Sequence, residues 1–165
     1  MPLQEMNNYI RNDLSNDVAL YLNRKVQDFH NVAQYYSPSG YFNEYTVQAV
    51  AFQCINAWIA ANENINHYLV RTEIGYGGFA NRADIMITYD AGNGAHNIAL
   101  EFKANFSADS VNTDVGLLDA IRGVQNPPID DGYACYIIRF GHGGWANQID
   151  EPLQDGVALV PILVD

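Results

Sequence analysis

The chain has little cysteine, few basic residues and no long apolar run, and each of these deficits narrows what the protein can be. Only two cysteines occur among 165 residues, Cys54 and Cys135, and both lie in apolar stretches far apart in the sequence. We therefore expect two buried free thiols rather than a disulfide framework or a thiolate metal site. The four histidines are not spaced as metal ligands, and no serine or cysteine has a nearby base that would indicate nucleophilic catalysis.

No hydrophobic run approaches the roughly 20 residues that a membrane span requires. The N-terminal stretch lacks the basic start and apolar block of a signal peptide. Together with the free thiols, these features predict a cytoplasmic protein. Hydrophobic residues make up 48% of the chain, so we expect one folded domain over residues 1–165 with a core of its own.

Basic residues are scarce, with eight Lys and Arg against nineteen Asp and Glu, and the net charge is −11. General nucleic-acid binders are usually basic, so this balance predicts weak non-specific affinity or a partner that supplies substrate binding. The distribution is uneven, because five of the eight basic residues fall in one stretch of the chain: Arg71, Arg82, Lys103, Arg122 and Arg139.

The most informative stretch, residues 81–105, reads as two strands joined by a turn. Turn-forming residues cluster at 90–94 between two β-rich runs. Strand side chains alternate between faces, so Glu101 and Lys103 share one face of the second strand. Antiparallel pairing would bring Asp84 on the first strand towards Glu101. The alternate positions of the second strand are apolar and are expected to pack inward: Ile98, Leu100 and Phe102.

Two carboxylates beside an ammonium group suggest a particular chemistry. Carboxylates at close range repel each other unless a cation or a proton lies between them. Hard oxygen ligands suit Mg²⁺ or Mn²⁺ better than zinc, and an adjacent lysine can orient water or stabilise charge on a phosphate. Asp84 is also disfavoured by propensity in the middle of a strand, which is typical of a functional position. The alternative is a solvated strand face that carries an ordinary Glu–Lys pair.

Asp84 followed by Glu101-Phe102-Lys103 on the next strand resembles the signature of the PD-(D/E)xK nuclease superfamily. The similarity runs from about residue 44 to about residue 140, although Ala83 stands where the signature has proline. The resemblance implies a restriction-endonuclease-like fold and Mg²⁺ or Mn²⁺ bound by Asp84, Glu101 and the Phe102 carbonyl. It further implies that Lys103 positions or activates the attacking water, and that the substrate is nucleic acid, DNA being favoured over RNA.

The family also places an acidic residue on the helix that precedes the hairpin. Here residues 43–62 predict that helix, with Asn43 as its N-cap and Glu44 in its first turn. The predicted buried stripe is Val47, Ala51, Cys54 and Trp58. The resemblance makes Glu44 a third metal ligand, whereas a favourable interaction with the helix dipole explains it equally well. Glu73, on the preceding strand, is a competing acid.

Substrate-binding candidates come from the basic residues and from the helix that follows Lys103. Arg82 lies close to Asp84 in the sequence. In many family members the helix after Glu-x-Lys offers a polar side chain to the site, and residues 112–125 predict that helix, with Thr113 or Asp114 near its cap. Arg122 and Gln125 are the candidates there, with exposed surface as the alternative for each.

The remaining pattern completes an α/β fold, a central mixed sheet of about five strands flanked by helices on both faces. Apolar periodicity predicts another helix over 17–36, capped by Ser15 or Asn16. Further strands are predicted over 67–74, 133–140 and 157–164, and Pro161 indicates that the last of these is an edge strand or carries a bulge.

Another class of function fits the acidic composition. The alternative interpretation is a non-catalytic subunit with a nuclease fold, or an acidic inhibitor that mimics DNA. Carboxylates that converge on Lys103 favour the enzyme. The mimic is favoured if the acids of the C-terminal part form one exposed face: Asp130, Asp131, Asp150, Glu151 and Asp155. A homodimer or a partner subunit is a further expectation, since cutting two strands often takes two sites.

Overall fold

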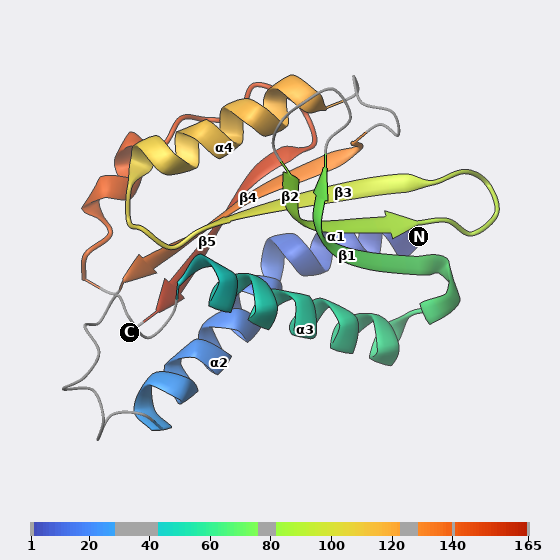
Figure 1. Ribbon diagram of the computed structural model, residues 1–165, viewed down its shortest axis with the longest axis horizontal. Coiled ribbons are helices and arrows are strands. Elements are labelled where there is room, and N and C mark those ends of the chain that lie inside the picture. The colour runs from blue at the N-terminus through green and yellow to red at the C-terminus, as the bar shows by residue number, and fades with distance from the viewer. Residues whose placement is uncertain (1, 29–42, 76–81, 123–128, 140, 165) are drawn as a thin grey trace.

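A computed structural model describes residues 2–28, 43–75, 82–122, 129–139 and 141–164. Five strands form one mixed sheet in the order β1–β2–β3–β4–β5 (Figure 1). The β1–β2 and β2–β3 pairs are antiparallel, and the β3–β4 and β4–β5 pairs are parallel. The predicted α/β class with a mixed five-stranded sheet is therefore confirmed. The strands are β1 (Tyr68–Gly75), β2 (Arg82–Tyr89), β3 (His96–Lys103), β4 (Asp131–Arg139) and β5 (Val157–Val164).

Helices cover both faces of this sheet (Figure 1). On one face α1 (Pro2–Asn12), α2 (Leu14–Asp28) and α3 (Glu44–Asn62) enclose a core cluster with Ile85, Leu100, Phe102 and their neighbours. On the other face α4 (Ala108–Ile121) packs over a second, smaller cluster that includes Met86 and Ala99. Two short 3₁₀ segments, η3 (Ile65–His67) and η4 (Gly144–Gln148), complete the elements. No helix among the described residues has the length and apolarity needed to cross a membrane.

The helix boundaries differ from the sequence predictions in instructive ways. Helix α1 was not predicted, and α2 begins at Leu14, so Ser15 and Asn16 lie inside a helix instead of capping one. The predicted continuation over 29–36 lies outside the described residues. The predicted cap of α3 is confirmed, because the Asn43 side chain accepts a hydrogen bond from the Thr46 N–H at 2.9 Å. The buried stripe of α3 includes Val47 and Ala51, but Cys54 and Trp58 are only half-buried. The stripe is completed by Gln48, Val50, Ile55 and Ile59.

Helix α4 spans Ala108–Ile121, earlier than the predicted 112–125. The polar side chains near residue 112 suggested the start of the helix. In the structure, some of them make tertiary contacts instead. Asn112 accepts a hydrogen bond from the Asp150 N–H at 2.7 Å and donates one to the Gln148 carbonyl at 3.2 Å. Asp114 consequently lies within the helix and not at its start.

Two smaller predictions can be checked directly. Strand β5 is an edge strand, as Pro161 indicated. Both cysteines are free thiols, although Cys54 is half-buried and only Cys135 is fully enclosed. Burial raises the pKa of Cys54 to about 11 and that of Cys135 well above its ordinary value, so neither thiol is a reactive thiolate at neutral pH.

A bend in the β1–β2 pair lies directly beside Asp84. The ladder pairs Thr72 with Ile85 and Ile74 with Ala83, but it skips Glu73, whose φ is +54°. Tyr68 and Val70 pack against the larger cluster, whereas Ile74 and Ala83 belong with the cluster under α4. The side-chain alternation is thus reversed at the bend, because regular alternation would put Ala83 on the same face as Ile85 and the structure puts it on the other. Figure 1 shows that both β1 and β2 bend along their length.

Replacing Glu73 by glycine should relieve the cost of this backbone conformation. A positive φ costs a residue with a β-carbon roughly 1–2 kcal/mol, whereas glycine adopts it freely. We expect Glu73→Gly to be more stable than Glu73→Ala by about 1 kcal/mol in urea denaturation. Both variants lack the carboxylate, so the comparison isolates the backbone. An alanine variant as stable as the glycine variant would contradict the positive φ.

Candidate functional site

The candidate site lies at the end of β3, where side chains from four elements meet. The Lys103 Nζ lies 3.3 Å from the Glu44 Oε1 at the start of α3 and 3.6 Å from the Asp114 Oδ2 on α4. The Glu44–Lys103 contact joins positions 59 residues apart in the sequence. The predicted Glu44 is therefore beside Lys103, and Asp114 joins the group although it was not predicted to do so.

Asp84 is held against β3 by a backbone hydrogen bond. Its Oδ2 accepts from the Phe102 N–H at 2.7 Å. The antiparallel register pairs Ile85 with Leu100, and the next positions along the two strands are Asp84 and Glu101. Glu101 is 5% exposed and Asp84 is half-buried. The structure thus brings Asp84, Glu101 and Lys103 to the same end of the β2–β3 pair.

Gln48, a buried amide on α3, supports this arrangement from behind. Its Nε2 donates to the Asp84 carbonyl at 2.7 Å and lies 3.4 Å from the Glu73 Oε1. The amide therefore ties the bend at Glu73 to the backbone of Asp84. The sequence pattern did not indicate this role for Gln48, because the bend that Gln48 contacts is a tertiary feature.

The site holds more negative than positive charge, and the pKa values of Asp84, Asp114 and Lys103 are all raised. Burial raises the pKa of Asp84 to about 6, and the nearby Glu44 carboxylate adds to this, while the Phe102 N–H opposes it. Burial raises the pKa of Asp114 to about 7 against the attraction of Lys103. Burial by itself would lower the pKa of Lys103, but Asp114 and Glu44 outweigh it and the net pKa is raised. Lys103 is therefore an ammonium group, and the carboxyls are poised to lose protons when a further cation arrives.

Asp114 was missed because the predicted helix began too late. A signal was present, since Asp114 falls on the apolar stripe of α4 with Val111, Val115 and Leu118. An acidic residue on a buried stripe is rare without a partner, and that partner is Lys103. The helical periodicity in the sequence does not by itself show which cation pairs with Asp114.

The predicted substrate-binding residues are scattered. Arg82 is exposed at the first position of β2, at the same end as Asp84. Arg122 lies beyond the last turn of α4, the end away from Lys103, where its guanidinium packs so closely on Gly156 that an added β-carbon there would lie 2.5 Å from Nε. The structure does not bring Arg122 to the site. Gln125 lies outside the described residues.

The donor set fits a hard divalent cation. No three His, Cys, Asp or Glu side chains within the described ranges converge closely enough to hold a metal by themselves. Mg²⁺, however, usually takes only one or two carboxylates and fills its other positions with water and substrate phosphate oxygens. Asp84 and Glu101, with the backbone carbonyl of Phe102, supply such a set, while Glu44 is paired with Lys103.

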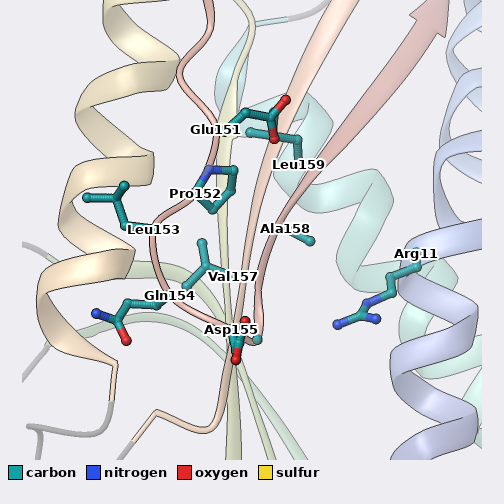
Figure 2. A pocket seen from close by; sticks show the side chains of 10 residues that line it. Arg11, Glu151, Pro152, Leu153, Gln154, Asp155, Val157, Ala158 and Leu159 are labelled. Atoms are coloured by element: carbon teal, nitrogen blue, oxygen red, sulfur yellow. The ribbon is translucent and has the colours of Figure 1, made fainter.

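The cavity in Figure 2 lies elsewhere. It measures about 600 Å³ and is lined by Arg11 of α1 and by residues 151–159, which lead into the start of β5. Because β3, β4 and β5 are parallel, the start of β5 is at the opposite end of the sheet from Lys103. We therefore do not assign this cavity to the site.

Comparison with protein-family models, with curated proteins and with solved structures finds no match to this chain. The resemblance to the PD-(D/E)xK nucleases therefore depends on the residues Asp84, Glu101, Phe102 and Lys103 and stays a prediction.

Proposed function

We propose that this protein is a metal-dependent nuclease that hydrolyses phosphodiester bonds, with DNA favoured over RNA. The observation that carries the proposal is the pairing of Lys103 with carboxylates from α3 and α4, at the same end of β3 as Asp84 of β2 and the buried Glu101. Several desolvated carboxylates around one ammonium are costly for a purely structural cluster, and they match the needs of a cation-binding site.

Each residue has a role in this proposal. Asp84 and Glu101, with the Phe102 carbonyl, hold Mg²⁺ or Mn²⁺. The bound ion supplies Lewis-acid polarisation of the phosphate and a more acidic water. Lys103 orients the attacking water and stabilises negative charge that develops on the phosphate.

The other two acids, Asp114 and Glu44, both contact Lys103. Asp114 holds the ammonium of Lys103 in place. Glu44 shares that ammonium and is available to the cation as a further ligand.

The DNA-mimic alternative receives less support. Two of the five C-terminal acids are committed to contacts within the fold, since Asp131 accepts a hydrogen bond from Asn7 at 3.1 Å and Asp130 accepts one from the Asn97 N–H at 2.8 Å. Only Asp150, Glu151 and Asp155 are freely exposed. A charge mimic needs a longer exposed array.

Calorimetric titration of Mn²⁺ and Mg²⁺ tests the proposal. We expect wild type to bind the ion and Asp84→Ala to bind at least about tenfold more weakly, because one of two carboxylate ligands is lost. The matched control is Asp109→Ala, which removes an exposed carboxylate from the first turn of α4. The titration is repeated with a short oligonucleotide present, because a phosphate can supply missing ligands. Absence of binding to wild type under both conditions would overturn the assignment.

A further inference from the structure

Arg71, on the edge strand β1, is a half-buried cation that lacks an acidic partner. Its Nη2 donates to the Thr88 Oγ1 at 3.1 Å, and its Nε is buried without a hydrogen-bond partner. Within the described ranges no carboxylate oxygen lies within 4.0 Å of its guanidinium, whereas Lys103 has two such neighbours. The other described arginines also have no carboxylate within 4.0 Å, so what sets Arg71 apart is the hydrogen bond to Thr88 that fixes its guanidinium against the sheet.

A relay across three strands fixes the position of this guanidinium. The Thr88 Oγ1 donates its only hydrogen to the Asn97 Oδ1 at 2.8 Å, so its lone pairs are left to accept from Arg71. Asn97 on β3 is 1% exposed, and its backbone N–H donates to the Asp130 Oδ2 at 2.8 Å. Arg71 is therefore anchored on one side and has unused donors on the others. A planar, anchored guanidinium is well suited to binding phosphate through paired hydrogen bonds.

The relay lies on the same side of the sheet as α4. Arg71 is directly opposite Met86, and Met86 belongs to the core cluster under α4. Opposite residues of an antiparallel pair share a face. Thr88 is four residues from Asp84 along β2, which corresponds to roughly 13 Å of strand. A nucleic-acid strand that crosses the sheet spans this distance with only a few phosphates.

We propose that Arg71, held by Thr88, binds a backbone phosphate of the substrate a few nucleotides from the scissile bond. This inference rests on the proposed nuclease function and adds a substrate contact to it. It makes the substrate an oligonucleotide long enough to reach both places, and it adds a cation that can hold a polyanion on a chain of net charge −11.

The test measures oligonucleotide binding by fluorescence anisotropy in an Asp84→Ala background, without added metal. A series of oligonucleotides carries one neutral methylphosphonate linkage at successive positions. We expect Arg71→Gln to weaken binding of the all-phosphate strand by about tenfold or more, the loss typical of a charged hydrogen bond. It should also lower the slope of log K against log salt by about one. Arg71→Lys should recover part of the affinity.

The decisive readout is the response to one linkage. A methylphosphonate at the contacted position should weaken binding to the parent protein but cause no further loss in Arg71→Gln. The control is Arg11→Gln, which removes the same charge from α1 on the opposite face of the sheet. Equal binding by the Arg71 and Arg11 variants, or an equal loss at every linkage, would overturn the proposal.

A second measurement separates this inference from the nuclease proposal. If wild type supplied with Mn²⁺ neither binds nor cleaves an oligonucleotide, the nuclease proposal fails. Titration with inorganic pyrophosphate, followed by NMR through the Arg71 Nε–Hε resonance, then shows whether an anion binds at Arg71. A saturable shift that disappears in Thr88→Val would support an anion site at Arg71, and the lack of any shift would overturn it.

Discussion

Glu101→Gln should reduce metal-dependent cleavage by about a thousandfold or more, while the protein remains folded. Glutamine keeps the shape of the side chain but removes the charge that we propose holds the cation opposite Asp84, and a site with one carboxylate should stabilise the reacting phosphate poorly. Asp84→Ala and Lys103→Ala should be comparably inactive. Cleavage of a labelled oligonucleotide in Mn²⁺ measures the effect, and urea denaturation checks the fold.

The matched control is Asp109→Asn, an equivalent loss of charge on the exposed surface of α4. It should cleave at the wild-type rate. If Glu101→Gln cleaves as fast as wild type, the assignment of the site is wrong, because no other described carboxylate takes the place of Glu101 on β3.

The metal-free protein should lose stability as the pH rises from about 4 to about 7. Burial raises the pKa of Asp84 to about 6 and that of Asp114 to about 7, from 3.8 in each case. Between these values the folded state holds protons that the unfolded state has released. The stability that these groups contribute is therefore fully present below about pH 4 and is lost as the pH rises through the folded pKa values.

Asp114→Asn should remove much of this slope and raise stability at pH 7 by about 2 kcal/mol, since asparagine stays neutral where aspartate must ionise. Loss of the attraction to Lys103 reduces the gain but does not abolish it, because Glu44 still pairs with that ammonium. The measurement is the free energy of unfolding in urea at several pH values with a chelator present. A variant that keeps the wild-type slope would show that Asp114 is not the desolvated group. Saturating Mn²⁺ should flatten the slope in wild type, because a bound cation favours the ionised carboxylates.

Sequence patterns were sufficient for the hairpin and for the acids on it. Strand alternation places Glu101 and Lys103 on the same face of the strand, whatever surrounds them. The turn-forming residues at 90–94 favour an antiparallel pair, and this pairing brings Asp84 close to Glu101. The N-cap of α3 was likewise readable, because an Asn43 side chain satisfies a local backbone donor at Thr46. These are short-range effects, and neighbouring residues determine them.

Long-range packing determined which further side chains reach Lys103 and where the strands bend. Glu44 and Asp114 reach Lys103 only because α3 and α4 cover opposite faces of one sheet and both present a side chain at the end of β3. The bend at Glu73 reverses the alternation that local pattern predicts, since Gln48 and the core under α4 stabilise a conformation that a strand avoids.

The sequence by itself therefore determined the α/β class and the paired acids on the hairpin, because these follow from residue type and local periodicity, and the hard-cation chemistry stays a prediction. The tertiary structure alone decided which acids share the ammonium of Lys103, that Arg122 stays away from the site, and that Arg71 is held by Thr88 with no acidic neighbour among the described residues. Those outcomes depend on which helix packs against which strand. The spacing of residues along the sequence does not predict how close such distant segments lie in the fold.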